Sequence, residues 1–310
     1  MEMRKVLCDE LEKMMTKDEN IIIIDADLAK ANGTYSLRKK FPNRALDVGI
    51  AEQNMASIAA GLSSYGFKPV ILSFTPFVTR RICDQISVSI AYAKQNVKII
   101  GTDPGISAEL NGGTHMSVED IGVLRSIPTL VIFEPVDSIQ LKQALPQIME
   151  YNGPVYIRMF RKETPEVFDS NYRFNLFKGD ILKEGKDVTI VASGIMVEES
   201  VKAGKLLLAA GIDAEIINIH TIKPIDENIL LKSVKKTGCV VTCENHNIIG
   251  GLRSAVSEVL IENYPVPLQS IGIKDVFGEV GRLGDLKVKF NMAADDIIKK
   301  VQNVIKMKNK

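Results

Sequence analysis

The sequence is poor in the residues that build disulfide scaffolds and metal sites. Its 310 residues include only four cysteines and three histidines, and tryptophan is absent. Four cysteines are too few to staple a chain of this length, and they fit a reducing cytoplasm, where we expect the protein to be located. We expect no metal site in this chain, because Cys239 and Cys243 have neither a second cysteine pair nor a group of histidines nearby.

The chain also lacks an excess of one charge and a long apolar run. Lysine and arginine total 39 against 38 aspartates and glutamates, so the sequence carries no electrostatic signature of binding to nucleic acid or to an anionic membrane. No apolar stretch is long enough to cross a bilayer, and residues 1–20 are typical of an amphipathic helix rather than a signal peptide. The expected partners are therefore proteins and small molecules.

Short β-branched runs alternate with helical patterns along the whole chain. Runs such as IIIID, KPVILSF and TLVIF are largely apolar, as expected for parallel strands buried on both faces. The length favours two domains. We predict two doubly wound α/β domains with mostly parallel sheets: residues 1–165, then a polar, turn-rich linker over 166–185, then a smaller domain over 186–310.

The unusual residues of the first domain are concentrated in the loops after its predicted strands. Ligands of parallel sheets bind beyond the carboxyl ends of the strands, so these loops are the places where a site is expected. One of them, GTDPGISAELNGGTH, holds four glycines and a histidine, and another places two phenylalanines at a strand end. The candidates in these loops are Asp27, Glu52, Phe74, Phe77 and His115.

Taken singly, each candidate also has a purely structural interpretation. A glutamate in the first turn of a helix, such as Glu52, is stabilised by the helix dipole by roughly 0.3–1 kcal/mol without any function. Phenylalanines pack in cores, and Asp27 and Asn32 are residue types common in turns and helix caps. Spacing alone leaves both interpretations open.

In their order along the chain, these loops resemble the second half of transketolase, which consists of a pyrimidine-binding domain and a C-terminal domain. In split transketolases this half is a separate chain. The resemblance covers essentially all residues. The segments that show it are DADLAKANGT, DVGIAEQNMASIAAGL, SFTPFVTRRICDQI, GTDPGISAELNGGTHMSVEDIGVLRSIP, EPVD, GPVYIRMFRKE and, in the second domain, ENHNIIGGLRSAVSEVL.

The resemblance implies thiamine diphosphate as cofactor and Glu52 as the residue that hydrogen-bonds its pyrimidine ring. A carboxyl group there can exchange a proton with the ring nitrogen and so activate the cofactor for attack on a ketose carbonyl. Phe77, with Phe74 nearby, would pack against the pyrimidine. Asp27 would lie close to the cofactor or to the substrate channel.

The resemblance also implies a set of substrate-binding residues. His115 matches a histidine that reaches the substrate, and Arg161 matches an arginine that holds a sugar phosphate. Asp103 and Asn111 stand at two sugar-contacting positions where the family usually has histidine and aspartate. The implied reaction moves a two-carbon ketol unit from a ketose phosphate to an aldose phosphate, as in pentose phosphate metabolism.

The sequence lacks the GDG motif through which transketolases bind the diphosphate with a divalent metal such as Mg²⁺. We therefore expect a partner subunit to supply the diphosphate-binding domain and most of the metal ligands, in an α2β2 assembly. Three alternatives stay open: the β subunit of a 2-oxoacid dehydrogenase, an enzyme like deoxyxylulose-phosphate synthase, and a non-catalytic partner subunit.

Overall fold

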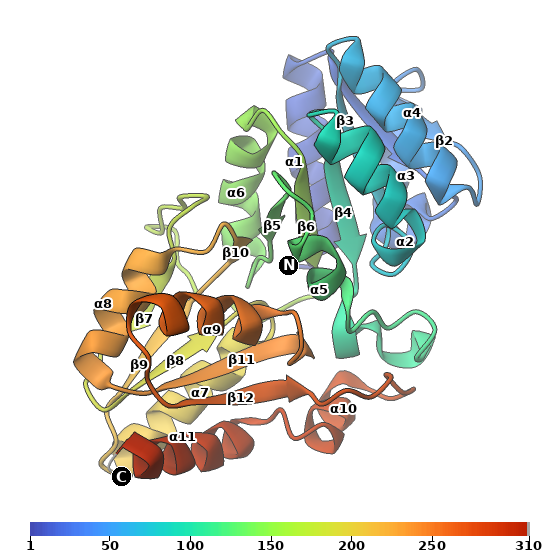
Figure 1. Cartoon of the computed structure of the whole chain (residues 1–310). Helices are drawn as coiled ribbons and strands as arrows, with labels where there is room; N and C mark the ends of the chain where they lie inside the picture. The colour runs from blue at the N-terminus through green and yellow to red at the C-terminus, as the bar shows by residue number, and fades with distance from the viewer. Residues whose placement is uncertain (309–310) are drawn as a thin grey trace.

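The computed structural model describes residues 1–308, and the chain forms two α/β units (Figure 1). The first contains a seven-stranded sheet and the second a five-stranded sheet. Neighbouring strands are parallel except at one edge of each sheet. There β10 (Thr221–Lys223) pairs with β5 (Val131–Phe133), and β7 (Asp180–Lys183) pairs with β9 (Ala214–Asn218). The predicted fold class is confirmed.

The first sheet is completed by five more strands. These are β1 (Ile21–Asp25), β2 (Ala45–Asp47), β3 (Lys68–Phe74), β4 (Lys98–Thr102) and β6 (Val155–Met159). The order across the sheet is β10-β5-β6-β4-β3-β1-β2. Short helices lie in the loops between strands: α2 (Ala29–Asn32), α3 (Tyr35–Lys40) and the 3-10 helices η1 (Arg80–Ile82) and η3 (Gly105–Asn111).

The apolar strands of this sheet serve two cores at once. Ile21 and Ile23 face a core with α1 (Met3–Lys17) and α6 (Ser138–Glu150). The alternate residues of the same strand face a second core, formed with α4 (Glu52–Ser64), the π-helix η2 (Gln85–Tyr92) and α5 (Asp120–Arg125). Because successive strand side chains point to opposite faces, both sets must be apolar, which accounts for the unbroken isoleucine run.

The second sheet is built in the same way. Its other strands are β8 (Val188–Ala192), β11 (Val240–Asn247) and β12 (Leu268–Ile273), in the order β12-β11-β8-β9-β7. Helices α7 (Met196–Ala209) and α11 (Ala294–Lys308) pack on one face, and α8 (Glu227–Thr237) and α9 (Leu252–Asn263) on the other. Helix α10 (Leu283–Lys289) lies against η3 of the first unit. No helix within residues 1–308 is both long and apolar enough to cross a membrane.

One strand of the first sheet comes from the second half of the chain. After β9 the chain returns to the first unit and adds β10 to the free edge of β5, with Thr221 opposite Phe133. The backbone N–H of Glu134 donates to the carbonyl of His220 at 2.7 Å and extends this pairing. The two units therefore share a sheet as well as a connector.

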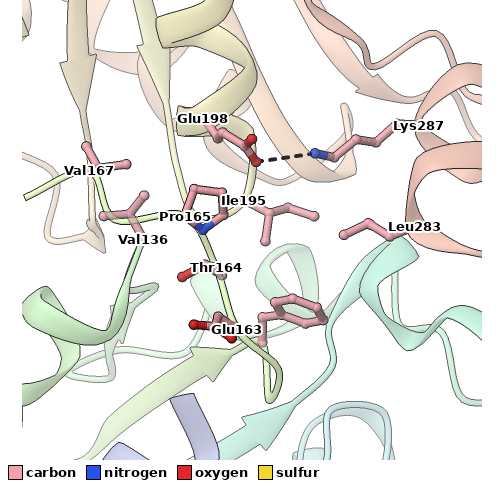
Figure 2. Close-up of a pocket in the computed structure, with 11 residues that line it drawn as sticks. Val136, Glu163, Thr164, Pro165, Val167, Ile195, Glu198, Leu283 and Lys287 are labelled. Carbon is pink, nitrogen blue, oxygen red and sulfur yellow. Dashed lines mark ion pairs between the residues drawn. The ribbon is translucent and has the colours of Figure 1, made fainter. Parts of the chain in front are cut away.

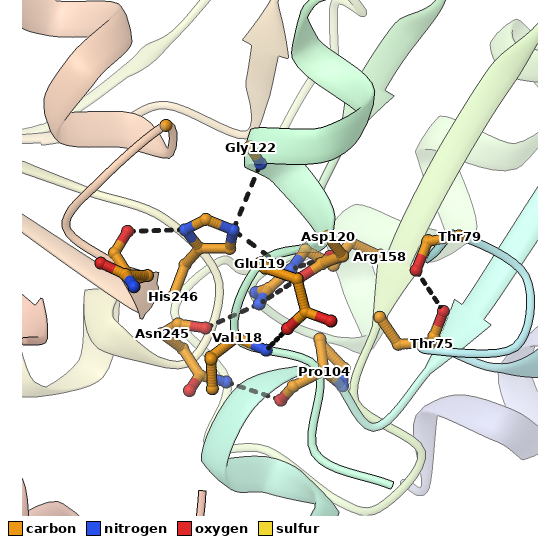
Figure 3. Close-up of polar contacts among 12 residues, drawn as sticks. Thr75, Thr79, Pro104, Val118, Glu119, Asp120, Gly122, Arg158, Asn245 and His246 are labelled. Atoms are coloured by element: carbon orange, nitrogen blue, oxygen red, sulfur yellow. Dashed lines mark hydrogen bonds and ion pairs between the residues drawn. The ribbon is translucent and has the colours of Figure 1, made fainter. Parts of the chain in front are cut away.

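A buried polar network also joins the two units (Figure 3). The guanidinium of Arg158, on β6, is fully buried; its Nε donates to Oδ2 of Asp120 at 2.7 Å and another nitrogen contacts Glu134. From the second unit, Ser193 donates to Glu134 at 2.8 Å, and the carbonyl of Asn245 accepts from Arg158 at 2.6 Å. Burial alone would raise the pKa of Asp120, but Arg158 reverses this and holds it below its ordinary value.

Candidate functional site

The candidate residues lie at the edge of the first sheet where parallel strands end. Strands β1, β3 and β4 are neighbours in register, so that Asp25 lies beside Leu72 and Phe74 beside Thr102. The loops after these strands therefore open at one edge, as expected for a parallel sheet.

Glu52 is the first residue of α4 and is buried, with 4% of its surface exposed. Within residues 1–308, the one hydrogen bond of its carboxylate is to Arg81 and not to the backbone of the helix. Its Oε1 accepts this hydrogen bond from Nη1 of Arg81 at 2.7 Å. A buried carboxylate is costly without a partner. The Glu52 carboxylate thus interacts with a residue of the loop after β3 and does not cap its own helix.

Three rings form a cluster beside this ion pair. The centroids of Phe74 and Phe77 are 6.3 Å apart, and the ring of His115 lies edge-on to both, at 5.8 Å from Phe74 and 5.3 Å from Phe77. The Nδ1 atom of His115 is 3.0 Å from the hydroxyl of Thr114. The half-buried phenylalanines leave part of their surface free to contact a ligand.

Arg81 connects Glu52 with this cluster, and the sequence did not single it out. Its guanidinium carbon lies 4.0 Å from the centroid of the Phe77 ring, while Nη1 binds Glu52. The only hint in the sequence is the arginine pair that follows SFTPFVT, and nothing in its spacing shows which arginine turns towards the carboxylate.

Arg161 lies beside Phe74 of the ring cluster and is paired with Asp103. Its backbone N–H donates to Oδ1 of Asp103 at 3.1 Å, and its Nε contacts Oδ2 of the same carboxylate. The guanidinium carbon is 4.9 Å from the centroid of the Phe74 ring. Burial raises the pKa of Asp103, and Arg161 opposes that effect.

Two of the predicted residues stand apart from this cluster. Asp27 is exposed, adopts a left-handed φ of 60°, and its backbone N–H donates to the Asp47 carboxylate at 3.0 Å. Asn111 ends η3 with an exposed side chain. Within residues 1–308, neither side chain forms a hydrogen bond or an ion pair with Glu52 or His115.

Asp25 and Asn32, by contrast, are buried at the same edge of the sheet. Asp25 accepts from the backbone N–H of Leu28 at 2.5 Å, but its Oδ2 has no partner within residues 1–308. The amide oxygen of Asn32 accepts from Thr102 at 3.0 Å, and its Nδ2 likewise has no partner there. For Asp25, the signal in the sequence was a charged residue that closes the otherwise apolar run IIIID.

The second unit fixes the loop that carries Asp103. The Asn245 side chain donates to the carbonyl of Pro104 at 2.9 Å (Figure 3). It also accepts from the backbone N–H of Ile106 at 2.9 Å. Gly105 passes so close that a Cβ atom there would lie 2.3 Å from the Asn245 amide oxygen. The position of this loop therefore depends on β11 as well as on β4.

A separate pocket lies between the two units and contains none of the candidate residues (Figure 2). Its walls are largely apolar, and two of its three charged groups, Glu198 and Lys287, pair with each other at 3.8 Å. We assign it to the packing of the units.

The Glu52 and Phe77 side chains fit a flat ligand that carries N–H groups. Both already contact one planar group with N–H donors, the guanidinium of Arg81. An aminopyrimidine ring has the same two needs, an aromatic face to stack on and a polar partner at its edge. Residues 1–308 contain no cluster of three His, Cys, Asp or Glu side chains that could hold a metal.

Comparison with known proteins identifies the family. Residues 1–166 match the pyrimidine binding domain of transketolase, and residues 178–297 match the transketolase C-terminal domain. A solved structure described as a split gene transketolase, inactive beta4 tetramer, superposes with a TM-score of 0.91 at 40% identity and covers 99% of both chains.

Two relatives extend this match. The 6-deoxy-6-sulfo-D-fructose transketolase subunit SqwH of Clostridium sp. (strain MSTE9) is 49% identical over 307 residues, covering 99% of this chain and 95% of the relative. One of the apulose-4-phosphate transketolase subunits of Phocaeicola vulgatus is 33% identical over 304 residues, covering 98% and 97%. The resemblance predicted from the sequence is confirmed: the chain belongs to the transketolase family, as the type of subunit that joins the pyrimidine-binding and C-terminal domains in a split transketolase.

Proposed function

We propose that this chain supplies the pyrimidine half of a thiamine diphosphate site in a two-chain transketolase. Membership of the family implies dependence on this cofactor, which provides the electron sink for two-carbon transfer. The observation that carries the proposal is the buried Glu52 carboxylate beside the Phe77 ring. Residues 1–165 would form the cofactor-binding domain, 166–185 the linker and 186–310 the second domain.

Each candidate residue has a role in this proposal. Glu52 holds and exchanges a proton at the edge of the pyrimidine ring, and Phe77, supported by Phe74, binds its face. His115 contacts substrate oxygens and can donate a proton to them or accept one from them. Asp27 lines the channel at the sheet edge.

The substrate proposed is a ketose with an anionic end group, together with an aldose acceptor. The two relatives are named for 6-deoxy-6-sulfo-D-fructose and apulose 4-phosphate, one a sulfonate and the other a phosphate. Arg161 would bind the anionic group through the part of its guanidinium that Asp103 leaves free. Asn111 would contact the sugar from the exposed end of η3. Pentose phosphates remain within this class.

A partner subunit would hold the diphosphate and its Mg²⁺, in an α2β2 complex. The similar structure titled an inactive beta4 tetramer supports the view that this type of chain is inactive by itself. We also place the complex in the cytoplasm, which fits the four free cysteines.

The test is reconstitution with a diphosphate-binding transketolase subunit. We expect two-carbon transfer from xylulose 5-phosphate or from 6-deoxy-6-sulfofructose to an aldose phosphate in the complex, and none from this chain alone. In the same complex Glu52→Gln should lower kcat by about 100- to 10,000-fold, because glutamine keeps a hydrogen bond but cannot exchange the proton. Circular dichroism checks that the variant is folded.

Two results would contradict the proposal. One is near-normal turnover by the Glu52→Gln complex, and the other is robust activity of the isolated chain. Pyruvate with a lipoyl acceptor, and pyruvate with glyceraldehyde 3-phosphate, test for the dehydrogenase and synthase alternatives. A complex that binds the cofactor but transfers nothing from any donor would favour a non-catalytic subunit.

A further inference from the structure

We infer that Arg81 occupies the place of the cofactor's pyrimidine ring while this chain has no cofactor, and must leave before the ring can bind. This inference rests on the proposed function, since it takes Glu52 and Phe77 as the pyrimidine-binding pair. Its basis is that one side chain meets both: Nη1 lies 2.7 Å from Glu52 Oε1, and the guanidinium carbon lies 4.0 Å from the Phe77 centroid.

The guanidinium reproduces both interactions that an aminopyrimidine would make. It is flat, so it can lie against the Phe77 ring as a heterocycle does, and it presents N–H donors in its plane to the carboxylate. At a separation of 4.0 Å no layer of atoms fits between Arg81 and Phe77. A pyrimidine on this face of Phe77, bonded to Glu52, would therefore overlap Arg81.

The Arg81 side chain can move because most of the hydrogen bonds of this residue are made by its backbone and not by its guanidinium. Arg81 lies in the three-residue helix η1, its backbone N–H donates to Pro76, and its carbonyl accepts from the Gln53 side chain at 3.4 Å. Glu52 is the only hydrogen-bond partner of the guanidinium within residues 1–308, and the side chain is 43% exposed. The guanidinium can therefore turn into solvent once another N–H donor takes its place at the Glu52 carboxylate.

Arg81 in this position keeps Glu52 paired until the cofactor arrives. Without the arginine, the buried Glu52 carboxylate would have no partner in this chain, which costs free energy. With it, the pyrimidine must compete with the chain's own guanidinium. The apparent affinity for the pyrimidine is then the intrinsic affinity multiplied by the fraction of chains in which Arg81 has left Glu52.

The test measures binding rather than turnover. The full chain is titrated by calorimetry with 4-amino-5-hydroxymethyl-2-methylpyrimidine, the pyrimidine half of thiamine, and the reconstituted complex with thiamine diphosphate. In Arg81→Ala and Arg81→Gln, we expect both dissociation constants to fall by about three- to tenfold, equal to roughly 0.7–1.4 kcal/mol. Added methylguanidinium should weaken pyrimidine binding to Arg81→Ala, because it can refill the same place.

Arg80→Gln is the matched control. Arg80 is the neighbouring arginine, with the same exposed fraction, but it pairs with Glu119 at 2.6 Å and not with Glu52. It should bind both ligands as the unsubstituted chain does. Unchanged or weaker binding by the Arg81 variants, with clear binding by the unsubstituted protein, overturns the inference and leaves the proposed function intact. Absence of thiamine diphosphate binding to any form of the complex overturns both.

Discussion

At the scale of single residues, burial decides how the carboxyl groups at the strand ends behave. Asp25 is 1% exposed, and burial raises its pKa to about 6, although the Leu28 N–H and Arg38 both oppose the shift. The second carboxylate oxygen, Oδ2, has no partner within residues 1–308, which leaves room for a proton on it. Between about pH 4 and pH 6, Asp25 therefore holds a proton that an exposed aspartate would have lost.

This shift predicts a pH-dependent stability. The pKa of Asp25 is higher in the folded chain than its ordinary value of 3.8, so the folded state binds more protons than the unfolded state between about pH 4 and pH 6. The stabilisation is complete below that window and is lost as the pH rises through it. A shift of two units corresponds to about 3 kcal/mol. In urea unfolding across this pH range, the unfolding free energy of the unsubstituted chain should fall with rising pH relative to that of Asp25→Asn.

The control is Asp84→Asn, which removes an exposed aspartate. Its unfolding free energy should follow that of the unsubstituted chain at every pH. Parallel curves for Asp25→Asn and the unsubstituted chain would show instead that Asp25 is ionised throughout the window.

The sequence predicted which residues lie together at the candidate site, but it did not predict how their side chains contact one another. Glu52, Phe77 and His115 were predicted to share a site because their loops resemble one family in the same order, and the structure brings them together. Their chemical roles stay predictions. The link through Arg81 could not be predicted, because it depends on the direction in which one side chain leaves a three-residue helix.

At the scale of elements, strand β4 is anchored at its beginning by a buried lysine. Lys98 opens the strand with no exposed surface, and its Nζ donates to the carbonyls of Tyr151 and Gly153, both at 2.7 Å. It also donates to the Asn96 side chain at 2.6 Å. These bonds tie β4 to the turn that leads into β6.

We predict that Lys98→Met destabilises the chain by about 2–5 kcal/mol. Methionine fills the apolar part of the space but leaves buried carbonyl groups without a donor, and each such loss costs roughly 1–3 kcal/mol. The measurement is the urea unfolding free energy. Lys142→Met, on the exposed face of α6, is the control and should change stability by less than about 0.5 kcal/mol. Equal stability of both variants would mean that water replaces the lysine.

Local patterns predicted most strands and failed where pairing is not local. The run IIIID predicted β1 because each of its four isoleucines faces one of the two cores. Strand β10 has only three residues, and its place in the first sheet depends on the return of the chain from the second unit. The pattern of apolar residues in the sequence does not show that β10 pairs with β5 in the first sheet.

At the scale of the whole molecule, the Arg158 network couples the two units. The cation balances two buried carboxylates, Asp120 and Glu134. From the second unit, Ser193 donates to Glu134 and the carbonyl of Asn245 accepts from Arg158. The same network continues through Asn245 to the loop that carries Asp103. The second unit thus shapes the candidate site without contributing a residue to the ring cluster.

Arg158→Met should lower the unfolding free energy by about 3–5 kcal/mol, because two buried carboxylates would lose their cation. Urea unfolding measures the change. Arg173→Met, at an exposed arginine that donates to the backbone carbonyls of Ser170 and Tyr172, should be nearly neutral. Ser193→Ala removes one hydrogen bond to Glu134 and should cost about 1 kcal/mol, which gives a second test if Arg158→Met does not fold. Full stability of Arg158→Met would mean that the carboxyls need no counter-charge.

The shared strand β10 also limits how this chain can be divided. A fragment that stops in the connector after β6 would keep every candidate residue but lose the strand that covers β5. Its sheet would then end in a bare row of unpaired N–H and C=O groups, which is a template for strand addition by another molecule. Such a fragment would tend to aggregate, so the pyrimidine-binding unit can be produced cleanly only with the half of the chain that completes its sheet.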